Sequence, residues 1–246
     1  MARTMKTNQE HFKARPQESA KEKGVALVYI LIAIALFAAI SMTFMRQNDT
    51  SEAESMSDDK AEILASQLIA YAAQTKSAVD QMLFSGAKIN ELDFTLPTAA
   101  GFDTGTLIYK VYHPQGGGVI PGRLSSEAVS QTDTDPVAGW YMGRFNNVEW
   151  TATASDDAIL AAHQIKQKVC EKINVKINGS TSIPSLASGT LADYFIDDSF
   201  HTGTNADLTT DSSGSPVCAA CDKMASLCVS NPAQNTYTFY TILADQ

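Results

Sequence analysis

The sequence lacks the short motifs that carry the commonest enzymatic chemistries. It contains no G-x-S-x-G nucleophile motif, no H-E-x-x-H zinc motif and no glycine-rich phosphate-binding loop. Its four histidines, His11, His113, His163 and His201, form no catalytic arrangement, and we expect His163 at the protein surface. The sequence therefore predicts a protein that is not an enzyme.

Charged residues are absent from one long stretch near the N-terminus. From Gly24 to Met45 the chain has no Asp, Glu, Lys or Arg, and Lys23 and Arg46 flank these 22 residues. A helix of this length spans about 30 Å, the thickness of the hydrocarbon core of a bilayer. Because the stretch is apolar on every face, a membrane helix explains it better than a buried core helix does. We predict one transmembrane helix over residues 25–45.

Basic residues are concentrated before this helix, and acidic residues follow it. Residues 1–24 carry six Lys or Arg and three Glu, a net charge of +3; because the whole chain carries −9, residues 25–246 carry −12. The positive charge before the helix favours a cytoplasmic N-terminus. The acidic remainder is then expected on the far side of the membrane, and it gives no electrostatic reason to bind nucleic acid.

Cysteine is scarce, and all four cysteines lie beyond the predicted membrane helix, at Cys170, Cys218, Cys221 and Cys228. An even number outside the cytoplasm predicts disulfides. Three pairings are open, and we favour Cys170 with Cys228 and Cys218 with Cys221. The C-x-x-C spacing also occurs in zinc and redox sites, but the sequence offers neither regularly spaced further ligands nor a preceding strand.

The pattern of side chains in residues 46–88 predicts an amphipathic helix that extends the membrane helix. Apolar and small side chains recur at alternating steps of three and four residues, and the pattern stops at Ser85-Gly86, where Gly suits a helix C-terminus. The stripe consists of Ala61, Leu64, Leu68, Tyr71, Thr75, Ala78 and Met82.

Residues 89–246 predict an extracytoplasmic α+β head. β-Branched and aromatic residues predict strands at 106–113, 140–153 and 236–243, with Gly116-Gly117-Gly118 as a hairpin turn and residues 178–216 as loop. Ser155, followed by two Asp residues, predicts the start of a helix whose apolar face runs from Ile159 to Ile173.

The expected fold class is therefore α+β. A long N-terminal helix, with a transmembrane half and an amphipathic half, packs against a small antiparallel-sheet head that has one further helix.

Acidic residues gather late in the chain, at Asp193, Asp197, Asp198, Asp207 and Asp211. Carboxylates are preferred calcium ligands. Because the D-x-D-x-D-G pattern of a calcium loop is missing, we favour a solvated acidic loop and keep calcium binding as the alternative. We expect no other cofactor.

The N-terminus resembles those of type IV prepilins and of the pseudopilins of type II secretion. The residues that carry the resemblance are Lys21-Glu22-Lys23-Gly24 and the apolar residues 25–32. The resemblance implies that residues 1–24 are a leader peptide, which a prepilin peptidase removes between Gly24 and Val25, and that Val25 is then methylated. It also implies that the N-terminal helix packs against other pilin subunits and that an inner-membrane platform assembles them.

The chain departs from this family at Tyr29, the fifth position of the mature chain, where most members have Glu. That Glu is thought to neutralise the N-terminal amine of a neighbouring subunit, and a buried amine without such a partner is costly. The resemblance therefore implies a minor subunit rather than an abundant one. The alternative is a non-polymerising, single-pass envelope protein whose ectodomain binds a partner or a surface.

Overall fold

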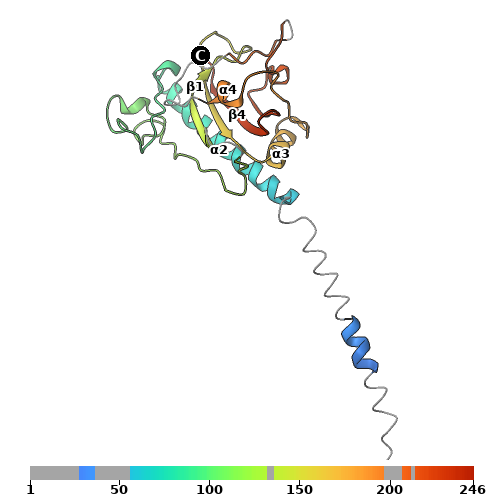
Figure 1. The fold of residues 1–246 in the computed structure, drawn as a ribbon. Helices are drawn as coiled ribbons and strands as arrows, with labels where there is room; N and C mark the ends of the chain where they lie inside the picture. The colour runs from blue at the N-terminus through green and yellow to red at the C-terminus, as the bar shows by residue number, and fades with distance from the viewer. Residues whose placement is uncertain (1–27, 37–55, 132–135, 197–206, 212–213) are drawn as a thin grey trace, which may run out of the picture. The chain divides into compact units, whose positions relative to one another are not determined.

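The computed structural model divides the chain into two units, Met1–Ser55 and Met56–Gln246. It describes residues 28–36, 56–131, 136–196, 207–211 and 214–246 (Figure 1). In the first unit, residues 28–36 are helical. Gly24, Val25 and the rest of the predicted transmembrane helix lie outside the described residues. Among the helices that are described, none has both the length and the apolar character needed to cross a membrane.

The second unit begins with helix α2, Asp58–Phe84. The hydroxyl of Ser57 caps this helix by accepting a hydrogen bond from the backbone N–H of Lys60, and two Asp residues in the first turn suit the positive end of the helix dipole. The buried side of α2 runs from Ala61 to Met82 and includes most of the predicted stripe. The amphipathic helix is thus confirmed over these residues, whereas residues 46–55 lie outside the described part.

Within the described residues, the strands form one four-stranded antiparallel sheet. The strands are β1 (Gly139–Asn146), β2 (Asp157–His163), β3 (Ser226–Asn231) and β4 (Thr236–Ala244). Their order is β1-β2-β4-β3, and each pair of neighbours is antiparallel. The α+β class and the last strand are confirmed.

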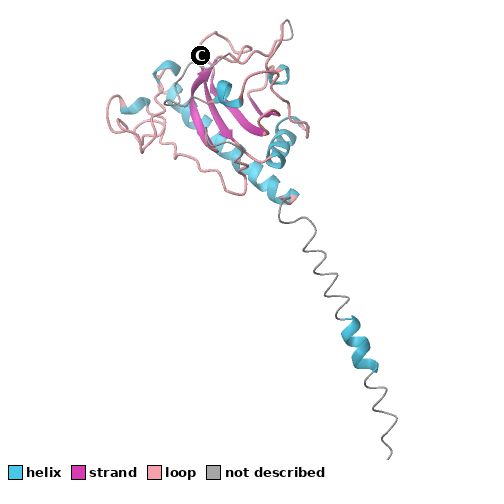
Figure 2. Cartoon of the chain, in the orientation of Figure 1, coloured by secondary structure: helices cyan, strands magenta, loops and turns pink. Residues whose placement is uncertain are grey.

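Both faces of the sheet are covered, and two apolar clusters fill the space. On one face Met142, Leu160 and Phe239 pack beneath α2. On the other face Ile159 and Tyr240 pack beneath irregular segments and the short helix α4, Leu191–Phe195 (Figure 2). The central strand β2 is therefore buried on both sides.

Helix α3, Gln167–Asn178, is fixed to the edge strand β3. A disulfide joins Cys170 to Cys228, and the buried amide of Asn174 donates to the carbonyl of Cys228 and accepts from its N–H. The sequence predicted one further helix in the head. The described residues contain two, α3 and α4, because α4 lies in the stretch that the sequence assigned to loop.

The prediction of a helix from Ser155 to Ile173 is wrong for the first half of this range. Residues 157–163 form β2, and helix starts only at Gln167. Because β2 is covered on both faces, its residues do not alternate between apolar and polar, and its Ala and Leu residues favour helix locally. Pairing with β1 and β4 overrides that preference. His163, expected at the surface, is 3% exposed, and its Nδ1 contacts the hydroxyl of Thr238 at 2.8 Å.

The strand predicted at 106–113 is also wrong. This segment forms a short 3₁₀ helix at Leu107–Tyr109, and Lys110 makes an isolated parallel bridge with Asp93. The side chain of Lys110 is buried, pairs with Asp93 at 2.9 Å and donates to the carbonyl of Gly101. The following glycines make a turn but no hairpin, since no described strand flanks them. Two more 3₁₀ turns occur at Ile89–Glu91 and Ala219–Cys221.

The prediction of strand at 140–153, as a pair or as one bent strand, is correct only for its first half. β1 ends at Asn146, and the chain then turns, so that Val148 makes an isolated parallel bridge with Leu208 instead of starting a second strand. A carboxylate that the sequence assigned to the first turn of a helix holds this turn: Asp157 accepts hydrogen bonds from the N–H of Val148 and the hydroxyl of Thr151.

Candidate functional site

A concave surface of the second unit lies beside α2, and we call it the α2 groove. It consists of three clefts between one flank of α2 and residues 107–125, each of about 300–320 Å³. Adjacent clefts share lining residues: Tyr71 and Gly122 line the first and second, and Ala78 and Gly117 line the second and third. The clefts therefore form one continuous line along the helix.

Tyr71 holds the far wall of the groove against α2. Its hydroxyl donates to the carbonyl of Ile120 at 3.0 Å and accepts from the N–H of Gly122 at 2.7 Å. Burial raises the pKa of Tyr71, although the hydrogen bond from Gly122 opposes the shift, so the hydroxyl keeps its proton at neutral pH. The wall is thus fixed by a side chain from the helix that it faces.

Gly122 is required for this close approach. A Cβ at this position would lie 2.6 Å from the ring of Tyr71 and 2.8 Å from the ring of Trp140. These two rings pack together with centroids 4.8 Å apart. The first cleft therefore has a rigid aromatic floor.

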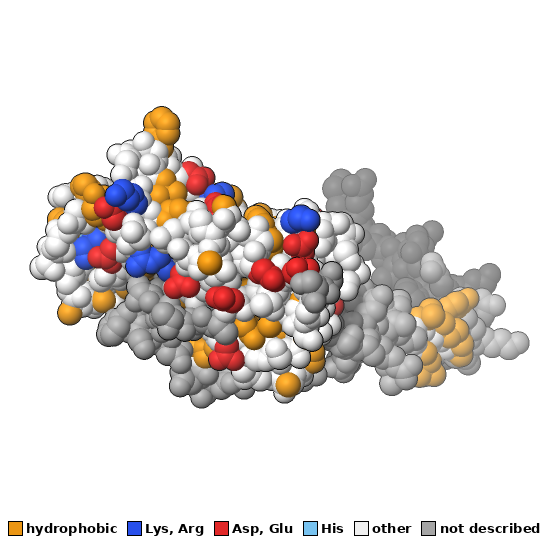
Figure 3. Space-filling view, turned by 90° about the horizontal axis from the view of Figure 1, so that it is seen from above, with side chains coloured by type: hydrophobic (Ala, Val, Ile, Leu, Met, Phe, Trp, Pro, Cys, Tyr) orange, Lys and Arg blue, Asp and Glu red, His pale blue; other side chains and the backbone are white. Residues whose placement is uncertain are grey.

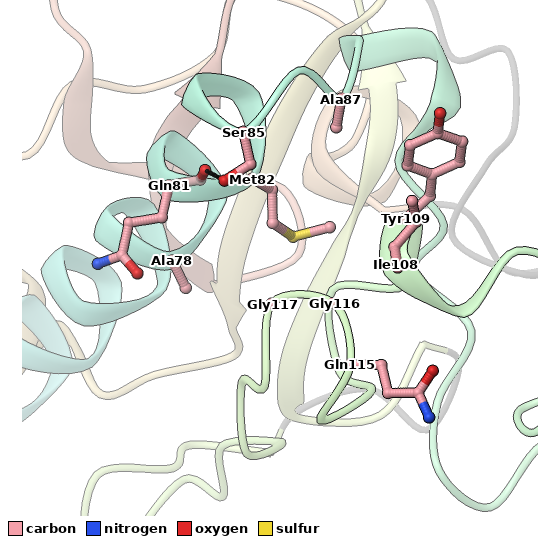
Figure 4. Close-up of a pocket in the computed structure, with 10 residues that line it drawn as sticks. All are labelled: Ala78, Gln81, Met82, Ser85, Ala87, Ile108, Tyr109, Gln115, Gly116 and Gly117. Carbon is pink, nitrogen blue, oxygen red and sulfur yellow. Dashed lines mark hydrogen bonds between the residues drawn. The ribbon is translucent and has the colours of Figure 1, made fainter.

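The third cleft lies at the C-terminal end of α2 (Figure 4). Gln81 and Met82 line it from the helix, and Ile108 and Gln115 line it from the opposite wall. Large apolar side chains near the groove are exposed to solvent: Phe84 is 95% exposed, Ile120 80% and Ile108 56%. Exposed apolar side chains around a groove are typical of a surface that contacts another molecule.

The predicted processing residues, Gly24 and Val25, lie outside the described residues. Tyr29 is described and is 68% exposed. The structure therefore provides no geometry for the cleavage site, and cleavage stays a prediction.

The four cysteines form two separate disulfides, Cys170–Cys228 and Cys218–Cys221, in the pairing that the sequence favoured. All four side chains are almost completely buried. The first disulfide joins α3 to β3, and the second closes a ring of four residues around a 3₁₀ turn. Their burial within the apolar clusters indicates a structural role.

The structure does not bring the described acidic candidates together. Asp193 caps α4 by accepting a hydrogen bond from the N–H of Thr190, whereas Asp207 and Asp211 are exposed. Asp197 and Asp198 lie outside the described residues. In the part of the chain that is described, no cluster of three or more His, Cys, Asp or Glu side chains could hold a metal ion.

The side chains that shape the groove were not identified as a site from the sequence. Tyr71 was assigned only to the helix stripe, and Arg123 received no role, because residues 107–125 have no repeating pattern. The sequence contains one signal, the recurrence of Gln67, Gln74 and Gln81 at intervals of seven residues. Each of these glutamines lines a different cleft.

Comparison with known proteins identified no relative of this chain. No family model, curated protein or solved structure matches the chain.

Proposed function

We propose that this chain is a pilin-like structural subunit of a type IV pilus or a type II secretion-type filament, without catalytic activity. A prepilin peptidase removes residues 1–24, and the mature chain is held in the inner membrane by the apolar helix that begins at Val25. The leader is cytoplasmic, and the C-terminal unit lies in the periplasm or in the filament outside the cell.

The observation that carries the proposal is the position of α2 after the leader and the apolar run. α2 has 27 residues and lays its buried stripe along one face of an antiparallel sheet. An apolar stretch, then an amphipathic helix, then an α+β unit with a disulfide near its C-terminus is the layout that the resemblance to pilins implies. The N-terminal motif and this layout are independent lines of support.

Tyr29 supports a minor position in the filament. A buried N-terminal amine without an acidic partner costs free energy in each subunit, and the cost accumulates in a filament made of identical copies. A subunit that occurs once, for example at a tip, avoids the accumulation. We propose that this chain is such a subunit.

The test is mass spectrometry of the N-terminus of the full-length chain purified from its native host. A mature chain that begins with methylated Val25 is the expected result. An intact Met1, or cleavage by signal peptidase at another position, would contradict the proposal.

A matched pair of variants separates processing from folding. Gly24→Leu should block removal of the leader, because the resemblance implies a requirement for Gly before the cleaved bond. Gly214→Leu is the control: Gly214 is exposed and a Cβ there has no atom within 4 Å, so processing should be unchanged. Normal removal of the leader in Gly24→Leu would argue against a prepilin peptidase.

The second candidate function is a single-pass envelope protein that binds a partner and does not polymerise. The α2 groove with its exposed apolar side chains favours this alternative. It predicts an uncleaved leader and no association with pilus assembly components, so the same mass spectrum distinguishes the two functions.

A further inference from the structure

We infer that the α2 groove binds an extended acidic segment of a partner polypeptide, with a carboxylate of that segment paired to Arg123. The inference does not rest on the pilin-like assignment, because every residue of the proposed site lies within residues 64–140.

The first observation is a set of unused hydrogen-bond donors in the first cleft. Arg123, the indole N–H of Trp140 and the amide of Gln67 all line this cleft, and none of them has a hydrogen bond or ion pair to the described residues. Arg and Trp side chains donate hydrogen bonds and cannot accept them. A ligand that hydrogen-bonds to these donors supplies acceptors.

The second observation is the charge of Arg123. Of the two arginines in the described part of the chain, Arg144 is engaged by the carbonyls of Ile89 and Leu92. Arg123 is exposed beside an aromatic floor in a chain whose net charge is −9. Most of the described lysines pair with Asp or Glu, and Figure 3 shows acidic and basic side chains lying close together on the face in view. An unpaired guanidinium next to aromatic rings fits a carboxylate, which it binds through two parallel hydrogen bonds.

The third observation is the length and chemistry of the groove. Its helical wall runs from Leu64 to Ser85, which corresponds to about 30 Å of α-helix. Gln67, Gln74 and Gln81 present amides about 10 Å apart, which matches about three residues of extended chain. Amides both donate and accept, as peptide groups do. Exposed Ile120 shares the second cleft with Gln74, and exposed Ile108 shares the third with Gln81, so both clefts also offer an apolar contact.

These observations favour a peptide over other carboxylates. A small acid fills one cleft and leaves the remaining two unused. An acidic polysaccharide supplies carboxylates but no apolar side chains for Ile108, Ile120 and Met82. An extended peptide in which acidic and aliphatic residues alternate satisfies the guanidinium, the amides and the apolar side chains together.

The test measures binding of two fluorescently labelled synthetic peptides to the full-length chain by anisotropy. In one peptide Glu alternates with Val, and in the other Gln replaces Glu. We expect the Glu peptide to bind about tenfold or more tightly than the Gln peptide, because the charge-assisted pair to Arg123 is lost in the latter. Binding should also change the fluorescence of Trp140.

Three variants locate the site. Arg123→Gln should weaken binding of the Glu peptide about tenfold or more, and Gln74→Glu should weaken it by placing a negative charge in the groove. Lys223→Gln, the control, removes one positive charge from a side chain that is 83% exposed and does not line the groove, so binding should be unchanged. All three substituted side chains are exposed, and an unchanged melting temperature checks that folding is intact.

Several results would overturn the inference. These are equal binding of the Glu and Gln peptides, equal binding to wild type and Arg123→Gln, or Arg123-dependent binding of alginate without binding of the Glu peptide. Self-association that Arg123→Gln abolishes while the Glu peptide fails to bind would instead identify a second copy as the occupant. Because none of these measurements depends on residues 1–24, failure here would leave the processing test untouched.

Discussion

The two faces of the sheet are stabilised in different ways. On one face a single long helix, α2, supplies a periodic stripe of apolar side chains, and lysines of α3 pair with the acids of its first turns, Asp58 and Glu62. On the other face irregular segments cover the sheet and are held by carboxylates bonded to backbone N–H groups. The comparison shows that a regular element can rely on local periodicity, whereas an irregular cover needs specific buried polar contacts.

Glu149 and Asp157 illustrate the second arrangement. Glu149 accepts hydrogen bonds from the N–H groups of Thr210 and Asp211, and Asp157 accepts from Val148 and Gln246. Each carboxylate therefore holds residues that are distant in sequence. Loss of the Asp157 contact leaves the buried N–H of Val148 without this partner, which is costly, whereas the contacts of Glu149 are more exposed.

The largest expected effect comes from the disulfides, one on each face. Replacing both Cys170 and Cys228 by Ala should lower the free energy of unfolding by about 4 kcal/mol, because the bond spans 58 residues. Replacing Cys218 and Cys221 should cost about 2 kcal/mol, because that loop is very short. Urea unfolding of the two double variants checks the order, and equal losses would contradict the argument from loop length.

Neighbouring residues of β2 test whether the faces are independent. Leu160 packs toward α2 and Ile159 toward α4, and both are 0% exposed. Substitution of either by Ala should cost about 3 kcal/mol. Hydrogen exchange should then increase in α2 for Leu160→Ala and in residues 186–196 and 217–221 for Ile159→Ala. The same exchange pattern in both variants would show that the faces loosen together.

The two faces should respond oppositely to acid. Burial raises the pKa of Asp157, although hydrogen bonds from Val148 and Gln246 oppose the shift. The folded protein therefore binds the proton of the Asp157 carboxyl more tightly than the unfolded chain does. As a result, the contribution of Asp157 to the free energy of unfolding decreases as pH rises from about 4 through the raised pKa. Hydrogen bonds from lysines lower the pKa of Asp58 and Glu62, so their contribution is lost as pH falls below the unfolded pKa values.

Asp157→Asn separates these two responses. Between about pH 7 and about pH 4 the variant should lose stability on acidification more steeply than wild type, because the opposing contribution of Asp157 is removed. The measurement is the slope of melting temperature against pH, which is independent of any constant effect of the substitution. Parallel slopes for the two proteins would refute the assignment to Asp157.

The smallest expected effect concerns the ion pairs between α2 and α3. Asp58 pairs with Lys168 at 2.8 Å and with Lys172 at 3.4 Å, and its side chain is 66% exposed. Asp58→Asn should lower the melting temperature slightly at low salt and not at high salt, because exposed pairs are screened. Asp59→Asn is the control, since Asp59 occupies the same helix turn and has no such pair. An equal, salt-independent change in both variants would indicate an effect on the helix dipole instead.

The local signals in the sequence were sufficient for α2 and β4. In α2 apolar and small residues recur in a helical pattern, and Gly86 marks its C-terminal end, whereas the Ser57 cap at its start was found only in the structure. In β4 β-branched and aromatic residues dominate. The position of the four cysteines beyond the predicted membrane helix predicted disulfides but left three pairings open, and the favoured one is confirmed.

The same signals failed for β2 and for residues 106–113. Strand β2 looks helical because both of its faces are buried, which removes the alternation that identifies a strand. Residues 106–113 have strand-like composition, yet no described strand pairs with them; they form a 3₁₀ turn, and Lys110 pairs with Asp93. In both cases the partner lies far away in the sequence.

By itself, the sequence determined the charge-free stretch near the N-terminus, the amphipathic helix, the α+β class and the supply of cysteines for disulfides. Tertiary structure alone decided which apolar segments became strands, which carboxylates were buried, and how Tyr71 and Gly122 bring residues 107–125 against α2 to form a groove. The physical reason is that periodicity and composition act over a few residues, whereas pairing, burial and close approach are properties of segments that meet only in the folded chain.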